Sequence, residues 1–137
     1  MKKYKLILTT RKLDFNAAIS FVKSKSSGGI VVFCGTVRNH NNNKKVIKIK
    51  YSSYKEMALS EMKNIVEFAM KRWEIKKAYL SHAEGELKIG MTSVIVALSC
   101  EHRKEAFEAC RYLIDTLKKK VPIWKQEFYE NSKKWVS

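Results

Sequence analysis

The sequence predicts an α+β protein, and three observations lead to this fold class. Helical and strand-like apolar patterns follow one another in the order β-α-β-β-α-β-β-α-β, which fits a single domain over residues 1–137. Hydrophobic residues make up 45% and charged residues 30% of the chain, as in a globular protein with a substantial core. The only proline, Pro122, separates a helical pattern from an alternating one. We therefore expect three helices and a mixed or antiparallel sheet.

The N-terminal part is predicted to contain a strand, a capped helix and a second strand. Residues 4–10 form a short apolar first strand, and Asp14 can cap a helix over residues 15–25. Residues 26–29 have the composition of a turn. Residues 30–37 are almost continuously apolar, which predicts a strand buried on both faces.

The rest of the chain continues this alternation of strands and helices. Residues 38–45 are the most polar segment, and residues 46–51 alternate between apolar and polar side chains, so strands 30–37 and 46–51 are expected to form a long hairpin. The remaining elements are expected in this order: helix 55–73, strand 76–83, a turn at 85–90, a central strand at 91–100, helix 103–119 and strand 123–128.

The net charge points to anionic partners. Lysine and arginine number 28 against 13 aspartate and glutamate residues, which gives a net charge of +15 and a pI near 9.8. Such a balance favours nucleic acid, phosphorylated metabolites or an acidic protein. A compositional bias of the whole surface towards lysine is the competing interpretation.

The apolar segments, the N-terminus and the cysteines all bear on the cellular compartment of the protein. No apolar run approaches the roughly 20 residues of a membrane helix, and the first ten residues lack the small-residue cleavage site of a signal peptide. We therefore expect a cytoplasmic protein. Cys34, Cys100 and Cys110 are odd in number and widely spaced, which argues against a disulfide framework or a zinc site.

Two lysines flank the corner at Pro122. Lys118 lies in the last turn of the predicted helix and Lys125 in the strand that follows, so a fixed corner can direct both into one pocket. A lysine acts as a base or nucleophile only when desolvation or neighbouring cations lower its pKa. Lys119 and Lys120 are cationic neighbours of Lys118, although a solvated helix end is the simpler interpretation for those two.

A second basic pair stands at the start of the same helix. His102 and Arg103 follow a buried strand, where the unpaired N–H groups and dipole of a helix N-terminus suit an anion. Arginine adds a bidentate phosphate clamp. The competing interpretation is a capping or packing His102 and a solvated Arg103.

Arg38 is a further candidate because it follows directly on strand 30–37. Ligands of α/β sheets often bind beyond strand ends, and Asn39 and His40 extend this polar segment. Residues 41–45 are better explained as a flexible tip. The chain has no Ser-His-Asp order, glycine-rich phosphate loop or metal-ligand spacing, and its three histidines are widely scattered.

Three segments resemble the large, catalytic subunit of molybdopterin synthase. They are Gly35-Thr36-Val37-Arg38-Asn39, Glu101-His102-Arg103-Lys104-Glu105-Ala106-Phe107-Glu108-Ala109 and Leu117-Lys118-Lys119-Lys120-Val121-Pro122-Ile123-Trp124-Lys125-Gln126-Glu127. They occur in the family's order and spacing, and the resemblance covers about residues 15–136. The segment with Trp-Lys after the lone proline is highly specific.

The resemblance implies an α/β hammerhead fold and a sulfurtransferase. Such a subunit forms a homodimer, and each copy docks one small ubiquitin-like sulfur-carrier subunit whose Gly-Gly tail ends in a thiocarboxylate, which gives a heterotetramer. The reaction adds two sulfurs to cyclic pyranopterin monophosphate and forms the dithiolene of molybdopterin, a step of molybdenum cofactor biosynthesis. The pterin is the substrate; no cofactor, metal, nucleic acid or membrane is implied.

The resemblance also assigns roles to individual residues. Its active-site lysines fall on Lys118 and Lys125; a neutral Lys118 would shuttle protons, and Lys125 would stabilise developing negative charge or assist that transfer. Which of the two is the proton shuttle stays open at this point. The substrate-contacting positions fall on Thr36, Val37, Arg38, His102, Arg103, Gln126 and Glu127.

The chain departs from the family pattern at two places. The turn reads His82-Ala83-Glu84-Gly85 where the family often has His-Arg-x-Gly, so the contribution of an arginine there is in doubt. The chain also ends at Ser137, where some members continue, so a pocket contact from a longer tail must be absent or come from elsewhere.

The alternative function is a small basic α+β module that binds RNA or another polyanion. RNA-binding modules usually present exposed aromatic side chains on a sheet for base stacking. Here the aromatic residues fall mainly at apparent core positions and in the C-terminal strand, which favours the enzyme.

Overall fold

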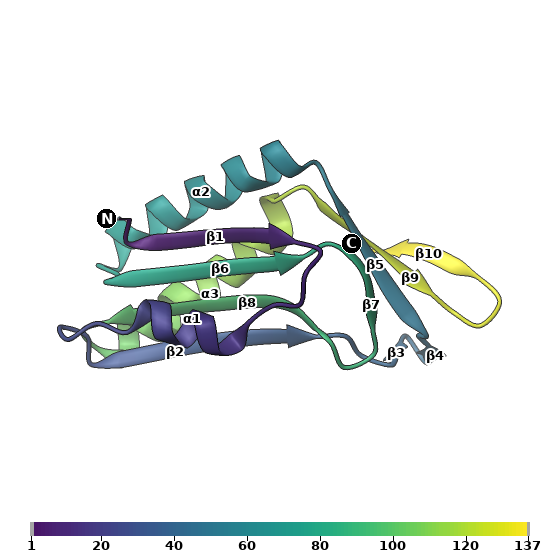
Figure 1. Cartoon of the computed structure of the whole chain (residues 1–137), viewed down its shortest axis with the longest axis horizontal. Coiled ribbons are helices and arrows are strands. Elements are labelled where there is room, and N and C mark those ends of the chain that lie inside the picture. The colour runs from purple at the N-terminus through teal and green to yellow at the C-terminus, as the bar shows by residue number, and fades with distance from the viewer. Residues whose placement is uncertain (1, 137) are drawn as a thin grey trace.

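Residues 2–136, which the computed structural model describes, form three helices and two four-stranded sheets with a small additional hairpin (Figure 1). The helices are α1 (Phe15–Val22), α2 (Lys55–Arg72) and α3 (Arg103–Lys120). The strands are β1 (Tyr4–Thr9), β2 (Gly29–Thr36), β3 (His40–Asn41), β4 (Lys44–Lys45), β5 (Lys48–Ser53), β6 (Lys77–Ala83), β7 (Gly85–Lys88), β8 (Thr92–Cys100), β9 (Ile123–Phe128) and β10 (Lys133–Val136). The predicted α+β class is confirmed; its extension as one domain over residues 1–137 stays a prediction.

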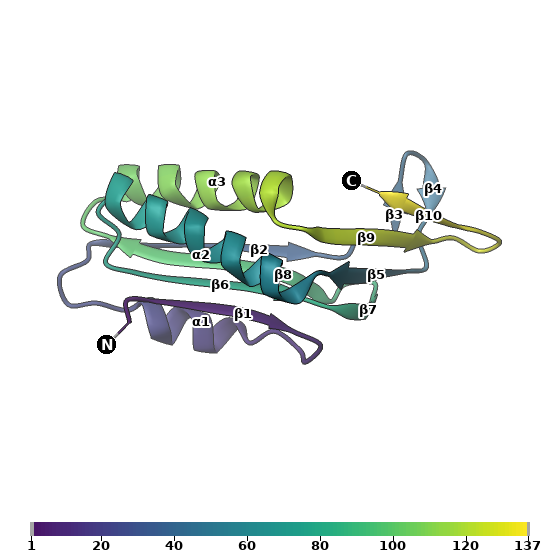
Figure 2. The same cartoon turned by 90° about the horizontal axis from the view of Figure 1, so that it is seen from above.

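The first sheet has the order β1-β6-β8-β2 and lies between two layers of helix. β1 and β6 are parallel, whereas β8 is antiparallel to both β6 and β2. α2 and α3 cover one face and the short α1 covers the other (Figure 2). α3 packs against this sheet through one apolar face, because its buried side chains recur at helical spacing. These side chains are Ala106, Ala109, Cys110, Leu113 and Leu117.

The second sheet, β10-β9-β5-β7, begins where α3 ends. The helix stops at Lys120 and β9 starts at Ile123, so the predicted corner at Pro122 is confirmed. The Pro122 carbonyl accepts a hydrogen bond from the Tyr54 N–H, which ties the corner to the start of α2. Because β9 pairs with β5 on one side and β10 on the other, the residues after the corner are held in a sheet.

The predicted hairpin of strands 30–37 and 46–51 is wrong. β2 pairs with β8 in the first sheet, whereas β5 pairs with β7 and β9 in the second. The nine-residue apolar β8 offers β2 a buried partner, and this long-range pairing outweighs sequence proximity. The polar segment between them forms the small β3–β4 hairpin, whose turn residues Asn42 and Asn43 have positive φ, as a tight two-residue turn requires.

Four smaller expectations also need correction. β2 is an edge strand rather than one buried on both faces, which leaves Ile30 and Phe33 about two-fifths exposed. Residues 85–88 form strand β7 rather than a turn, because they pair with β5. α1 ends at Val22, short of residue 25, and β10 was not expected. Asp14 does cap α1, through a 2.9 Å hydrogen bond from the Ala17 N–H to its Oδ1 atom.

Within residues 2–136, no helix is long and apolar enough to cross a membrane.

Candidate active site

The corner at Pro122 brings Lys118 and Lys125 together at one cavity. The cavity has a volume of about 200 Å³ and lies where the end of β2, the end of α3 and the second sheet meet. Its lining residues are Thr36, Val37, Arg38, His40, Ile49, Tyr51, Ser93, Lys118, Lys125 and Glu127. The predicted convergence of two lysines with Arg38 is therefore present in the fold.

A second cavity of about 130 Å³ adjoins the first. It is more apolar in character, with Leu117, Val121, Ile123 and Val136 in its wall. Tyr51, Lys118 and Lys125 line both cavities, so the two compartments meet at the lysines. This arrangement gives the lysines a polar side, where Arg38 lies, and an apolar side.

Lys118 has the electrostatic environment of a proton-transfer group. Desolvation lowers its pKa from the usual 10.5, and the positive charges of Lys125 and Arg38 lower it further. Both expected causes are present, but the neighbouring cations come from β9 and the end of β2. Lys119 and Lys120 do not supply them; both are exposed. The Lys118 side chain itself remains substantially exposed in the isolated chain, so a partner that covered the cavity mouth would desolvate it more.

Lys125 is held by a buried carboxylate. Its Nζ atom lies 3.6 Å from Oε2 of Glu127, and both residues lie on the same face of β9 because they are two positions apart. Glu127 is only 3% exposed. Lys125 also stands opposite Tyr51 in the β5–β9 register, which places the tyrosine ring beside it.

Tyr51 and His82 are site residues that sequence reasoning missed. Their rings meet edge to face, with centroids 4.7 Å apart, in the wall next to Lys118. The Nδ1 atom of His82 lies 2.8 Å from the Ala83 carbonyl, and burial lowers the His82 pKa from 6.5 to about 4. A neutral imidazole that donates from Nδ1 presents Nε2 as an acceptor. The alternation of residues 46–51 was the only sequence signal for Tyr51.

The turn 82–85, where the sequence departs from the family pattern, is tied to the end of β5. Glu84 accepts a hydrogen bond from the Ser53 hydroxyl, so an acid ties this turn to the end of β5. The turn therefore supplies His82 to the cavity wall and a carboxylate nearby. Ser137, at which the sequence departs from longer relatives, lies outside the described residues.

Arg38, Thr36 and Val37 contribute in different ways. Arg38 and Thr36 are exposed at the end of β2, with side chains free to meet a ligand in the cavity. Val37 is 5% exposed, its N–H donates to the Met91 carbonyl and its carbonyl accepts from the Gly90 N–H. Val37 therefore shapes the wall of the cavity, and both of its backbone groups already take part in hydrogen bonds.

The structure does not bring Gln126 into either cavity. Gln126 lies between Lys125 and Glu127 on β9, so strand alternation directs its side chain to the opposite face.

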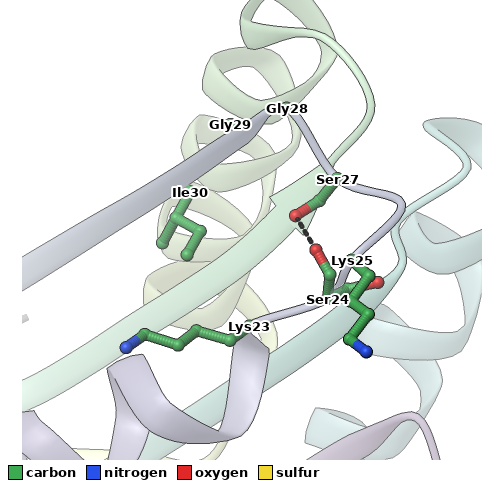
Figure 3. A pocket seen from close by; sticks show the side chains of 7 residues that line it. All are labelled: Lys23, Ser24, Lys25, Ser27, Gly28, Gly29 and Ile30. Atoms are coloured by element: carbon green, nitrogen blue, oxygen red, sulfur yellow. Dashed lines mark hydrogen bonds between the residues drawn. The ribbon is translucent and has the colours of Figure 1, made fainter.

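His102 and Arg103 lie at the far end of α3 from Lys118. The two ends are roughly 22 Å apart along the helix axis, at ~1.5 Å per residue, so the expectation that this pair joins the Lys118 pocket of its own chain is wrong. His102 is exposed and lies 3.7 Å from the Glu101 carboxylate. A third cavity, of about 540 Å³, is formed by the loop between α1 and β2, which runs beside this end of α3 (Figure 3). Lys23 and Lys25 extend from this loop, so the far end is also basic.

Among residues 2–136, no group of three His, Cys, Asp or Glu side chains is arranged to hold a metal ion. A cavity with two lysines, an arginine and a partly apolar wall suits an enzyme that acts on an anionic substrate.

Comparison with known proteins agrees with this class. The model of the MoaE protein family matches residues 8–120. The molybdopterin synthase catalytic subunit of Pyrococcus abyssi is 44% identical over 138 residues, which cover 99% of this chain and 93% of the relative. The human catalytic subunit is 40% identical over 127 residues, 93% of this chain and 68% of the relative. The crystal structure of molybdopterin synthase from Staphylococcus aureus superimposes with a TM-score of 0.90 at 30% identity and covers 100% of this chain and 98% of that one.

The chain therefore belongs to the MoaE family, whose similar members bear the name molybdopterin synthase catalytic subunit. The family and enzyme class expected from the sequence are confirmed.

Proposed function

We propose that this chain transfers sulfur from the thiocarboxylated tail of a small carrier subunit to cyclic pyranopterin monophosphate. The observation that carries the proposal is the meeting of Lys118, Lys125 and Arg38 around one cavity, in a chain of the MoaE family. A solved complex of subunits 1 and 2 of the molybdopterin-converting factor from Helicobacter pylori has the same fold.

The proposed chemistry follows from the two cavities that meet at the lysines, one polar and one more apolar. On the polar side, Arg38 is placed to hold a phosphate by charge-assisted hydrogen bonds. Lys118, with its pKa lowered by desolvation, Lys125 and Arg38, is the better candidate for moving protons during the transfer. The thiocarboxylate sulfur would attack the pterin as the cyclic phosphate opens, and water would then release the carrier tail as a carboxylate. Lys125 is held with its Nζ atom 3.6 Å from the Glu127 carboxylate, a position that suits the stabilisation of developing negative charge.

The carrier's tail fits the apolar side of the site. The cavity walled by Leu117, Val121 and Ile123 opens onto both lysines, and an extended Gly-Gly tail is thin enough for such a narrow space. Docking of the carrier would cover the exposed part of Lys118 and lower its pKa further. The net charge of +15 would steer an acidic carrier and an anionic pterin to the same region.

A role for His102 and Arg103 in phosphate binding requires a second copy of the chain. In one chain they lie a helix length away from Lys118. We infer that the homodimer brings this pair, and the basic loop beside it, to the cavity of the other subunit. The apolar side chains left exposed on β2 and α3, among them Phe33 and Phe107, provide a surface for such an interface.

The test is single-turnover conversion of the cyclic pterin phosphate by purified protein with thiocarboxylated carrier, with product detected by mass spectrometry. Formation of the dithiolene product with stoichiometric loss of the thiocarboxylate supports the proposal. No product, with a carrier shown by calorimetry to bind, would overturn it.

The second candidate, polyanion binding, rests on the charge and on exposed aromatic side chains such as Trp124 and Trp135. These two tryptophans lie on β9 and β10 of the second sheet, and not on the first sheet that the helices cover. Salt-sensitive, submicromolar binding to random RNA would favour this function instead.

A cytoplasmic location is also part of the proposal, because the three cysteines are free, as a reducing compartment allows.

A further inference from the structure

The buried carboxylate of Glu127 has more partners than Lys125. Its Oε1 atom accepts two hydrogen bonds, one from Asn41 Nδ2 at 2.9 Å and one from the Tyr129 hydroxyl at 2.6 Å. Its Oε2 atom faces Lys125 Nζ at 3.6 Å. Each oxygen therefore has at least one partner, and the partner on the side of the two cavities is Lys125, so Glu127 can act on the site through that lysine.

These partners keep Glu127 ionised. Burial alone would raise its pKa, but the hydrogen bonds from Tyr129 and Asn41 and the charge of Lys125 outweigh burial and lower it. A buried carboxylate that loses such donors either takes up a proton or shifts towards water. The ionised state of Glu127, and hence its hold on Lys125, depends on the two neutral donors.

Asn41 reaches Glu127 from a part of the chain that the lysine motif does not contain. It belongs to the β3–β4 hairpin, 86 residues away in sequence. The hairpin is set by its Asn42-Asn43 turn and by the hydrogen bond from the Val46 N–H to the Asn39 carbonyl, 2.9 Å long. It lies at the same end of the molecule as β9 and β10 (Figure 2). This segment, expected from the sequence to be a flexible tip, instead fixes a carboxylate.

Tyr129 fastens the same carboxylate from the end of β9. Its N–H donates to the Ser132 carbonyl at 2.7 Å, and Lys44 Nζ lies 5.4 Å from the centre of its ring. The hairpin and the β9–β10 turn thus meet at Tyr129 and line one groove of about 310 Å³. Movement of either segment would be transmitted to Glu127.

We propose that Asn41 and Tyr129 are positioning residues for the sulfur-transfer site. They hold Glu127 so that its second oxygen fixes the Lys125 ammonium at the point where the two cavities meet. The β3–β4 hairpin is then a functional part of the site, because it carries Asn41. This inference rests on the proposed function for its consequence in catalysis, but not for the hydrogen-bonded tie itself.

The kinetic test compares Asn41→Ala and Tyr129→Phe with a matched hairpin control, Asn43→Gly. Glycine suits the positive φ of position 43, and Asn43 makes no contact with Glu127, so this control should behave as wild type. For Asn41→Ala and Tyr129→Phe we expect kcat to fall by roughly 10- to 100-fold, as for a misplaced catalytic group. KM for the cyclic pterin should change less than kcat, because Arg38 is untouched.

A double-mutant cycle separates positioning from a general structural effect. If Asn41 acts through Glu127, Asn41→Ala should cost little once Glu127→Gln is present. Equal losses in both backgrounds, or wild-type kcat in Asn41→Ala and Tyr129→Phe, would overturn the proposal.

A second readout needs no activity. In protein with ¹³C-labelled glutamate carboxyl groups, the Glu127 pKa measured by NMR should rise in Asn41→Ala and Tyr129→Phe and stay at the wild-type value in Asn43→Gly. An unchanged Glu127 pKa in both variants would refute the tie even if the enzyme is active. A raised pKa in a protein that transfers no sulfur would instead refute the proposed function and leave the tie established.

Discussion

The two ends of α3 are both basic, yet they differ in what surrounds them. At the C-terminal end, Lys118 shares two adjoining cavities with Lys125, Arg38 and Tyr51, which come from three other segments of the chain. At the N-terminal end, His102 and Arg103 are exposed beside the loop before β2 and have no comparable enclosure. The C-terminal end lines two cavities, whereas the N-terminal end is an open surface.

In the proposed homodimer, one rigid helix would contribute to two sites at once. Because its ends are held apart by its length, α3 cannot bring them to one substrate within a chain. A symmetric dimer can, since the N-terminal end of one α3 is then free to meet the C-terminal end of the other. The predictions below test the contrast between an enclosed end and an open end.

The largest effect is expected at the enclosed end. Lys118→Ala should lower the single-turnover rate by about 10³-fold, the contribution of a positioned proton-transfer group. Lys119→Ala is the matched control, because Lys119 is the next residue and exposed. Its rate should match wild type within a factor of two or so. Wild-type turnover by Lys118→Ala would exclude the role given to Lys118.

The enclosed end should also show a pH signature in stability. Burial holds His82 neutral, with its pKa lowered to about 4, while the unfolded chain titrates near 6.5. Below pH 6.5 the unfolded state therefore binds a proton that the native state does not, so stability falls as the pH drops from 6.5 to 4. We expect a loss of roughly 3 kcal/mol in the free energy of unfolding from this group. In urea unfolding at pH 7 and pH 4, His82→Gln should lose less than wild type; an equal loss in both proteins would contradict the prediction.

The open end should matter only across subunits. Arg103→Ala should reduce turnover by about 10²-fold through loss of a charge-assisted phosphate contact. Mixing it with Lys118→Ala should restore activity, since half of the randomly mixed dimers carry one intact composite site, or about a quarter of wild-type activity. Recovery would be absent if each site were complete within one chain.

The smallest effect concerns packing at the open end. A Cβ atom at Gly28 would collide with the Glu101 carbonyl oxygen, a backbone atom that cannot move aside alone. Gly28→Ala should therefore destabilise the fold by ~1–3 kcal/mol, measured by urea unfolding. Gly90→Ala is a useful contrast, because its Cβ would meet no atom within 4 Å and its cost would come from its positive φ of 87° alone. Unchanged stability in Gly28→Ala would contradict the close packing of this loop on α3.

The enclosed end was largely predictable from sequence, for physical reasons. Helical periodicity up to Leu117, a proline at 122 and alternation afterwards are local signals, and they place Lys118 and Lys125 on the two sides of a corner. Strand alternation could also have excluded Gln126, and helix length could have separated Arg103 from Lys118.

The remaining parts of the site depend on long-range pairing, which local patterns do not encode. Tyr51 reaches Lys125 only because β5 pairs with β9. Asn41 reaches Glu127 because its separate β3–β4 hairpin comes just before β5, which carries it to the side of β9. For the same reason, local patterns predict a hairpin of strands 30–37 and 46–51, whereas β2 pairs with β8. The apolar run 30–37 reads equally well as a central strand or as an edge strand.

The most direct test of the enclosed site is the pH dependence of Lys118 acylation by a small anhydride, followed by peptide mass spectrometry in wild type and Lys125→Gln. The exposed Lys119 serves as the reference in each sample. Desolvation, Lys125 and Arg38 lower the Lys118 pKa, so its labelling midpoint should lie below 10.5 in wild type and move to higher pH when the charge of Lys125 is removed. A midpoint at or above 10.5 in wild type, or one that Lys125→Gln leaves in place, would contradict the convergence of the two lysines.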